Sequence, residues 1–171
     1  MKERISMNDR WKSDVQLRDV SEEDLPIFFE QQLDPSANDK AAFTVKDPSD
    51  WEVFSTHWRQ ILSDEAITKK TILLEGIVVG HISNFKQFDQ QAVSYWIGKQ
   101  YWNRGIATQA LFKFLNHVKT RPLYARAAKD NLASLRVLEK CGFSIIDEDK
   151  GFSNARGVEV EEYILKLGAA T

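Results

Sequence analysis

The stretch from residue 91 to residue 118 constrains the fold most, because its apolar pattern changes period partway along. Apolar side chains alternate over residues 92–97, which predicts a strand, and Gly98 ends that run. From residue 106 onward the apolar side chains recur at helical spacing instead. A further alternating run follows at residues 123–127. A strand, a helix and a second strand within so short a span predict a right-handed crossover between parallel strands.

The turn that opens this helix, residues 103–108, has the composition of an anion site. A helix start leaves four N–H groups without partners, and the helix dipole attracts negative charge to that end. Gly105 and Ala107 leave the backbone accessible, while Arg104 and Thr108 add a cation and a hydroxyl. These features predict a site for a phosphorylated ligand, although many such turns carry a glycine for structural reasons alone. The motifs of a P-loop and of a dinucleotide fold are both incomplete here.

The rest of the chain predicts hairpins as well as this crossover. The other expected elements are a strand at 15–20, a helix from Ser21, a helix from Asp47-Pro48, a hairpin around Glu75-Gly76, a helix at 131–140, and strands at 143–147 and 159–167. Residues 84–91 are expected to form a polar link, and Phe43 and Leu132 are expected to be buried. Hairpins near both ends and one crossover predict an α+β domain with a mixed sheet covered by helices.

Composition narrows the class of protein. The 171 residues carry a net charge of −2, which disfavours a nucleic-acid binder, since that would need a clustered basic face. One cysteine and three scattered histidines predict neither a disulfide framework nor a metal site. Without a membrane-spanning run or a signal-peptide core, a cytoplasmic protein is expected. Residues 1–13 are expected to be a flexible tail, and residues 14–171 to be a single domain.

Two segments, taken together, resemble the acetyl-CoA motifs of the GNAT superfamily of N-acetyltransferases. The first reads SYWIG at 94–98 and YWNRGIAT at 101–108. The second, AAKDNLASLRVLEKCGF at 127–143, is similar to that of the RimJ/RimL-like branch, which acetylates the N-termini of ribosomal proteins. The resemblance covers roughly residues 14 to 167.

This resemblance implies the acyl-CoA N-acyltransferase fold, a three-layer arrangement in which the two parallel strands of the sheet splay apart. It implies that the pantetheine arm pairs with the backbone around Trp96 and Ile97, and that Asn131 hydrogen-bonds to it. It places Ser134 near the thioester sulfur, as the candidate acid for the leaving thiolate. The pyrophosphate is expected on the backbone amides of Arg104, Gly105, Ile106, Ala107 and Thr108.

The sequence also departs from the family pattern. Glu139 stands where many members have a tyrosine acid, which leaves Ser134 as the candidate for that role. Ala92 stands where this branch commonly has a carboxylate, so the base is expected to be Glu161, Glu162 or a water chain, or to be absent.

The function expected is acetyl-CoA-dependent acetylation of a primary amine, on a protein N-terminus or a small molecule, by direct transfer in a ternary complex without a metal. Two alternatives stay open: a catalytically inactive CoA-binding sensor or interaction domain, and a nucleotide-dependent kinase or ATPase, for which the lysine and magnesium groups are missing. Neither nucleic acid nor membrane is an expected partner, and both a monomer and a homodimer are compatible with the sequence.

Overall fold

A computed structural model describes residues 15–168, so the expected tail at 1–13 lies outside the described residues. Its strands are β1 (Val15–Asp19), β2 (Thr68–Leu74), β3 (Ile77–Gln87), β4 (Gln90–Ile97), β5 (Leu123–Ala128), β6 (Ser144–Ser153) and β7 (Val158–Leu167). Its helices are α2 (Leu25–Gln31), α3 (Pro35–Ala41), α4 (Trp51–Ser63), α5 (Ile106–His117) and α6 (Leu132–Lys140), with short 3-10 turns η1 (Glu22–Asp24) and η2 (Lys99–Tyr101).

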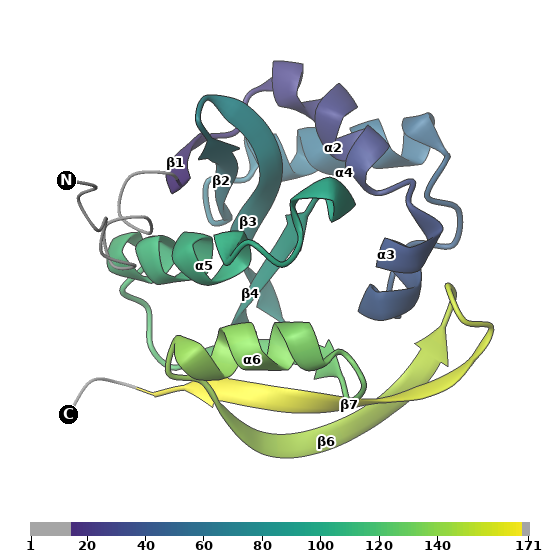
Figure 1. The fold of residues 1–171 in the computed structure, drawn as a ribbon, viewed down its shortest axis with the longest axis vertical. Coiled ribbons are helices and arrows are strands. Elements are labelled where there is room, and N and C mark those ends of the chain that lie inside the picture. Colours follow the sequence, from purple (N-terminus) through teal and green to yellow (C-terminus); the bar gives the residue numbers. More distant parts are fainter. Residues whose placement is uncertain (1–14, 169–171) are drawn as a thin grey trace, which may run out of the picture.

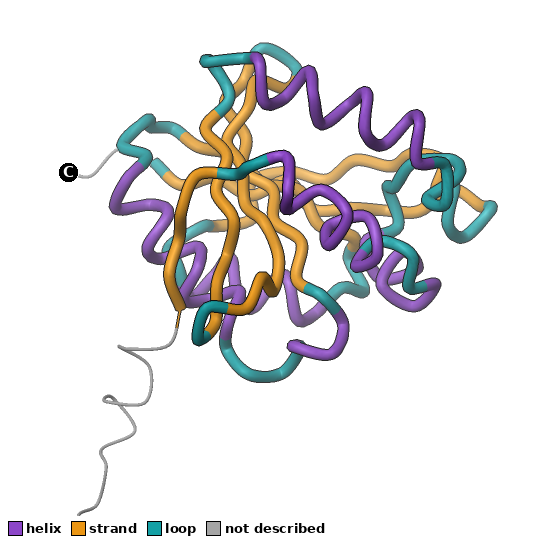
Figure 2. Tube along the Cα trace, turned by 90° about the horizontal axis from the view of Figure 1, so that it is seen from above, coloured by secondary structure: helices purple, strands orange, loops and turns teal. Residues whose placement is uncertain are grey.

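The strands form one seven-stranded sheet in the order β1-β2-β3-β4-β5-β7-β6 (Figure 1). Every neighbouring pair is antiparallel except β4 and β5, which are parallel. Helices lie on both sides of the strands (Figure 2). Helix α5 packs on β1, β3 and β4, and α6 packs on β5, while α2 contacts β3 and α4. The expected mixed sheet with one parallel pair is therefore confirmed.

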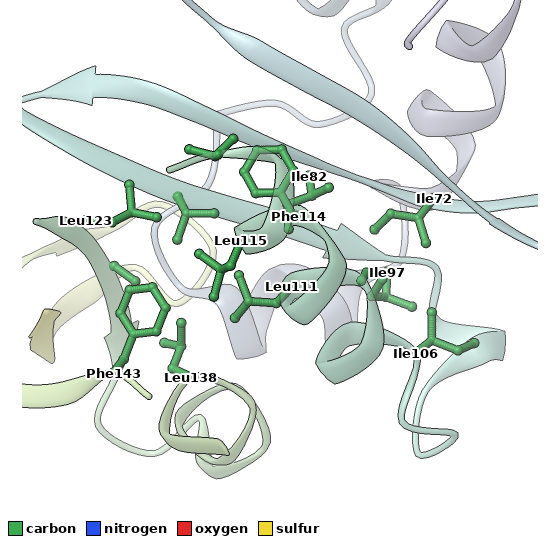
Figure 3. Close-up of a cluster of buried hydrophobic side chains, with 14 of the residues drawn as sticks. Ile72, Ile82, Ile97, Ile106, Leu111, Phe114, Leu115, Leu123, Leu138 and Phe143 are labelled. Carbon is green, nitrogen blue, oxygen red and sulfur yellow. The ribbon is translucent and has the colours of Figure 1, made fainter. Parts of the chain in front are cut away.

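The main core lies between the sheet and α5 (Figure 3). Leu111 and Phe114 of α5 have no exposed surface, and Leu138 of α6 has 1%. They meet apolar side chains from the sheet, including Ile82 and Leu123. The period of 3.6 in the helix and the period of 2 in the strands thus present their apolar sides to one another, as the sequence pattern requires.

A second cluster fills the other face of the sheet. Phe28 and Trp58 pack with ring centroids 5.1 Å apart, and both contact the ring of His81 at 4.7 and 4.9 Å. Burial lowers the pKa of His81 to about 4, so this imidazole is neutral near pH 7. The aromatic spacing of α4 therefore builds core, which fixes α2 and α4 against β3 through Val78 and His81.

Three local expectations were wrong. Residues 84–91 are not a link, because β3 and β4 continue through them to a tight turn at Phe88 and Asp89, whose φ angles are 50° and 60°. Asn84 satisfies this polar end of the hairpin by donating to Gln91 Oε1 and to the Ala92 carbonyl. Phe43 and Leu132 are 39% and 59% exposed, since neither has a layer packed over it.

Candidate active site

The start of α5 presents free backbone amides. Gly105 is the N-cap residue, with φ of 72°, and it has no side chain with which to cap the helix. The first hydrogen bond of the helix runs from Gln109 N–H to the Gly105 carbonyl at 3.1 Å. The N–H groups of residues 106–108 therefore lie before the hydrogen-bonded part of the helix, at its positive end. Arg104 is exposed beside them, with its guanidinium 5.9 Å from the Tyr101 ring.

The edge of β4 that faces β5 is largely unpaired. The two strands pair at one position, Ala92 with Tyr124, and diverge beyond it. Ile97 pairs with Gly80 of β3, and Gly98 N–H donates to the Val79 carbonyl, which fixes the phase of the antiparallel ladder. By alternation, the main-chain groups of Tyr95 and Ile97 point away from β3 and into the gap. Those of Trp96 point toward β3.

Two contacts hold this edge in place. The indole Nε1 of Trp102 donates to the Ile97 carbonyl at 2.8 Å. This carbonyl therefore already has a protein partner, and the N–H is the main-chain group of Ile97 that is left for a ligand. On the other side of β4, a Cβ atom at Gly80 would lie 2.0 Å from the Trp96 carbonyl oxygen. Glycine is therefore required at this position for β3 to approach β4 so closely.

A cavity of about 570 Å³ occupies the gap between β4 and β5. Sheet register divides its lining into two halves, because paired residues place their side chains on the same face. The half on the α6 face, which we call the donor half, is lined by Val93, Tyr95, Ala125, Ala127, Asn131, Ser134 and Leu138. The half on the opposite face, the acceptor half, is lined by Ala41, Phe43, Thr44, Phe85, Phe88, Ala92, Ser94, Trp96, Tyr124, Arg126, Asp149, Gly151, Glu162 and Ile164. The cavity therefore passes through the sheet.

The donor half contains a pair of hydroxyl groups. Asn131 is the N-cap of α6, and its Oδ1 accepts from the Ser134 N–H at 3.3 Å. This hydrogen bond at the helix cap, rather than packing, fixes the orientation of the Asn131 side-chain amide. Ser134 Oγ lies 2.8 Å from the Tyr95 hydroxyl. Burial raises the pKa of the Tyr95 phenol to about 12, against the opposing effect of the Ser134 hydrogen bond. Tyr95 is therefore protonated at neutral pH.

Tyr95 is the residue that the sequence interpretation missed. The alternation of residues 92–97 places it on the apolar face of β4, and no functional role was expected for it. Its neighbours on that face, Val93 and Ile97, are indeed buried. A phenol on such a face needs a hydrogen-bond partner when it is buried, and this was the available signal. Its partner is 39 residues away in the chain, so only the topology identifies it.

The acceptor half carries a partly buried ion pair. Arg126 Nη1 donates to Glu162 Oε1 at 2.6 Å and to Asp149 Oδ2 at 3.1 Å. Glu162 is 8% exposed, and the Phe88 ring lies over the Arg126 guanidinium at 4.7 Å. Of the two candidate bases on β7, Glu162 lines the cavity, whereas Glu161 is exposed and pairs with Lys129 at 3.5 Å.

The structure thus distributes the predicted site residues over two places. Trp96, Asn131 and Ser134 line the cavity, and Ile97 continues its β4 wall with main-chain groups. Arg104, Gly105, Ile106, Ala107 and Thr108 form the start of α5 outside that lining. Glu139 is exposed on α6. Within residues 15–168, no three histidine, cysteine or acidic side chains are grouped to hold a metal ion, and no helix is long and apolar enough to cross a membrane.

Comparison with solved structures agrees with this architecture. RimJ from Mycobacterium smegmatis, in complex with a CoA-disulfide, is 21% identical and superposes with a TM-score of 0.74 over 91% of this chain and 82% of that one. A ribosomal-protein-alanine N-acetyltransferase from Brucella melitensis is 19% identical, with a TM-score of 0.75 over 90% and 99% of the two chains. The microcin C7 self-immunity acetyltransferase MccE, in complex with acetyl-CoA and AMP, is 16% identical, with a TM-score of 0.71 over 93% and 94%. At these identities the likeness establishes the fold.

Family membership rests on the sequence itself. A comparison with curated protein sequences found no significant match. The model of the acetyltransferase (GNAT) domain, however, matches residues 14–144, most of the chain and all of the segments from β1 to α6 described above. The chain therefore belongs to the GNAT acetyltransferase family.

Proposed function

We propose that this protein transfers the acetyl group of acetyl-CoA to a primary amine by direct attack in a ternary complex. The observation that carries the proposal is the single pairing between β4 and β5, at Ala92 and Tyr124. It leaves a strand edge free beside a cavity that is continuous with the Ser134 hydroxyl. Extended amide-bearing ligands bind such an edge by adding main-chain hydrogen bonds to it.

The residues around this edge fit acetyl-CoA. The amides of residues 106–108 and the exposed Arg104 suit a diphosphate, because oriented N–H donors and a cation bind it without a metal. The carbonyl of Tyr95 and the N–H of Ile97 suit the amides of the pantetheine arm. The Asn131 amide suits one of the carbonyl groups of that arm. Bound there, acetyl-CoA supplies the acetyl group and a thiolate leaving group.

Each proton of the transfer can be followed. The amine nitrogen forms a bond to the acetyl carbon, the bond from that carbon to sulfur breaks, and the nitrogen loses one proton while the thiolate gains one. Ser134 Oγ–H donates to the developing thiolate. Tyr95 N–H, directed into the gap, donates to the acetyl oxygen as negative charge develops on it. The proton that Ser134 gives up is replaced from water in the cavity.

Tyr95 sets the direction of the Ser134 hydroxyl. The 2.8 Å contact allows either hydroxyl to donate, and we assign the donation to the phenol because it is the stronger acid, with Ser134 Oγ accepting. The hydrogen of Ser134 is then free to point toward the sulfur. With its pKa at about 12, Tyr95 keeps its proton at neutral pH and so remains a hydrogen-bond donor to Ser134 Oγ. Tyr95 therefore acts on the sulfur through Ser134, as a positioning residue.

The amine proton leaves through water. Glu162 lines the cavity, but its carboxylate already accepts a hydrogen bond from Arg126 at 2.6 Å. An α-amine with a pKa near 8 is about one-tenth deprotonated at pH 7, which costs only ~1.4 kcal/mol. A lysine side chain with a pKa near 10.4 would cost roughly 4.6 kcal/mol. A site without a dedicated base therefore favours α-amines and other amines of low pKa.

Calorimetric titration with acetyl-CoA tests the proposal. Gly105→Glu places a carboxylate where the diphosphate is expected, and we expect affinity to fall by more than about 100-fold. Gly76→Glu is the matched control, because Gly76 also has a positive φ (79°) and has open space around it in the β2–β3 turn. Unchanged affinity in Gly105→Glu, or no binding to the wild-type protein, would contradict the proposal. Tight binding without thiol release from any amine would instead indicate a CoA-binding domain without turnover.

A further inference from the structure

The acceptor half of the cavity has walls that are rich in aromatic side chains. Phe43, Phe85 and Phe88 line it, together with Tyr124 and the Trp96 side chain. Phe43 is 39% exposed and Phe88 is 72% exposed, so both present apolar surface to whatever enters. Binding sites for small groups combine such walls with a few polar side chains that fix orientation. The aromatic walls therefore indicate an apolar group on the acceptor.

The backbone at Phe88 supports a role in binding rather than in folding. Phe88 and Asp89 are the central residues of the β3–β4 turn, and both have positive φ angles of 50° and 60°. Asparagine and glycine adopt this conformation at least cost, and a bulky aromatic side chain is unfavourable there. Its ring packs on the Arg126 guanidinium at the edge of the cavity, 4.7 Å away. Phe88 thus lowers the stability of the turn while lining the cavity, and we attribute its presence to ligand binding.

The charges of the acceptor half select the sign of the ligand. One guanidinium, that of Arg126, lies between the carboxylates of Glu162 and Asp149, which leaves an excess negative charge. Lys150 also lines the cavity, but its ammonium pairs with Glu159 at 3.5 Å. An ammonium group is attracted to such a site, whereas a carboxylate beside the amine is repelled.

We propose that the acceptor half binds a primary amine that carries an aromatic or large apolar group and no carboxylate next to the amine. This inference rests on the proposed function, since it names the acceptor of that transfer. Two sources share this chemistry: a peptide whose first residue is aromatic or bulky, and a free arylalkylamine. A free amino acid carries a carboxylate beside its ammonium group and so lacks the net positive charge that this site attracts. A polyamine lacks the apolar group.

Thiol release with saturating acetyl-CoA tests the class. We expect kcat/KM for phenylalaninamide to exceed that for glycinamide by about 10- to 100-fold, from burial of the ring. At equal concentrations of the unprotonated amine, we expect it to exceed that for phenylalanine by at least about tenfold, from repulsion of the carboxylate. A higher kcat/KM for the tripeptide amide Phe-Ala-Ala than for 2-phenylethylamine would identify a peptide as the acceptor, and the reverse order would identify a free arylalkylamine. Equal values for glycinamide and phenylalaninamide, or a preference for phenylalanine or spermidine, would overturn the inference and leave acetyl transfer itself intact.

The variant Phe88→Asn makes the test specific. Asparagine suits the turn, so we expect the melting temperature to rise while kcat/KM for phenylalaninamide falls about tenfold and KM for acetyl-CoA stays unchanged. Phe152→Ala is the matched control, because Phe152 is similarly exposed (66%) but lies outside the cavity lining, and its kinetics should equal those of the wild type. Equal losses in both variants would refute the assignment.

If no amine releases thiol, the proposed function fails, and binding alone decides the inference. Saturation-transfer NMR with phenylalaninamide should then show ring contacts in the wild-type protein that weaken in Phe88→Asn. The same contacts in both proteins, or none in the wild type, would overturn it.

Discussion

Removal of the Tyr95 hydroxyl tests how the candidate acid is positioned. Tyr95→Phe deletes one oxygen and keeps the ring, which packs against the main core. The lost contact is the 2.8 Å hydrogen bond to Ser134 Oγ. One neutral hydrogen bond contributes about 0.5–1.5 kcal/mol net, which corresponds to roughly a 2- to 12-fold fall in kcat. We expect KM for acetyl-CoA to stay unchanged, because the main chain of β4 holds the arm.

A double-mutant cycle separates positioning from a merely structural effect. Ser134→Ala should lower kcat by about 10- to 1000-fold. If Tyr95 acts only through Ser134, then adding Tyr95→Phe to Ser134→Ala should change kcat by less than about twofold. Tyr163→Phe is the matched control, since Tyr163 also packs against the main core but lies outside the cavity lining.

The assay is thiol release at saturating amine, followed as a function of pH. Because burial raises the pKa of Tyr95 to about 12, the phenol stays protonated across the working range, and wild type and Tyr95→Phe should share one pH profile. Two results would refute the reasoning. One is a multiplicative loss in the double mutant, and the other is a limb of the pH profile that disappears with the hydroxyl.

Three further predictions concern stability. Burial would raise the pKa of Asp24, but hydrogen bonds from Arg18, Ser21 N–H and Thr71 outweigh it and lower the pKa from 3.8 to about 2. A lowered pKa contributes stability above pH 3.8 that is lost as pH falls toward 2. Asp24→Asn should therefore lose about 2 kcal/mol of the free energy of unfolding at pH 7, and this free energy, measured by urea unfolding, should depend less on pH below pH 4 than in the wild type. The same pH dependence in both proteins would contradict this. Gly80→Ala should destabilise by about 1–3 kcal/mol and weaken acetyl-CoA binding, because its Cβ meets the Trp96 carbonyl, and a calorimetric melt with titration checks both. Leu138→Ala, at 1% exposure, should lower the free energy of unfolding by about 2–5 kcal/mol without moving KM for amines, and a smaller loss would mean that the core collapses around it.

The fold was predictable where the sequence pattern has a single physical interpretation. The switch of apolar period after Gly98 predicted β4, α5 and β5, and the structure has all three. The interpretation failed at residues 84–91, where polarity was taken as a sign of a link. Polar side chains are compatible with a strand when they pair across a hairpin, as Asn84 and Gln91 do, and such pairing depends on register rather than on composition.

The candidate site was predictable in its parts but not in its assembly. Asn131 and Ser134 were expected in the site from the resemblance of residues 127–143 to the second family motif, and both line the cavity. Tyr95 did not follow, because its hydroxyl gains meaning only when α6 lies beside β4. The acceptor half was still less predictable, since its walls come from the end of α3, loops and strands spread between Ala41 and Ile164. Local periodicity contains no information about which of these segments meet.

The divergence of β4 from β5 accounts for both halves of the site. Had the two parallel strands paired fully, the main-chain groups of Tyr95 and Ile97 would be satisfied by β5, and the sheet would separate α6 from the ion pair at Arg126. An unmade backbone hydrogen bond costs about 1–3 kcal/mol when buried, so a gap of this length needs compensation. Part of this compensation comes from Trp102, whose indole N–H donates a hydrogen bond to the Ile97 carbonyl. Another part comes from water or ligand in the open cavity. The strand edge that weakens the sheet is thus the same edge that an amide-bearing ligand would restore, and binding of that ligand should stabilise the whole domain in proportion to its affinity.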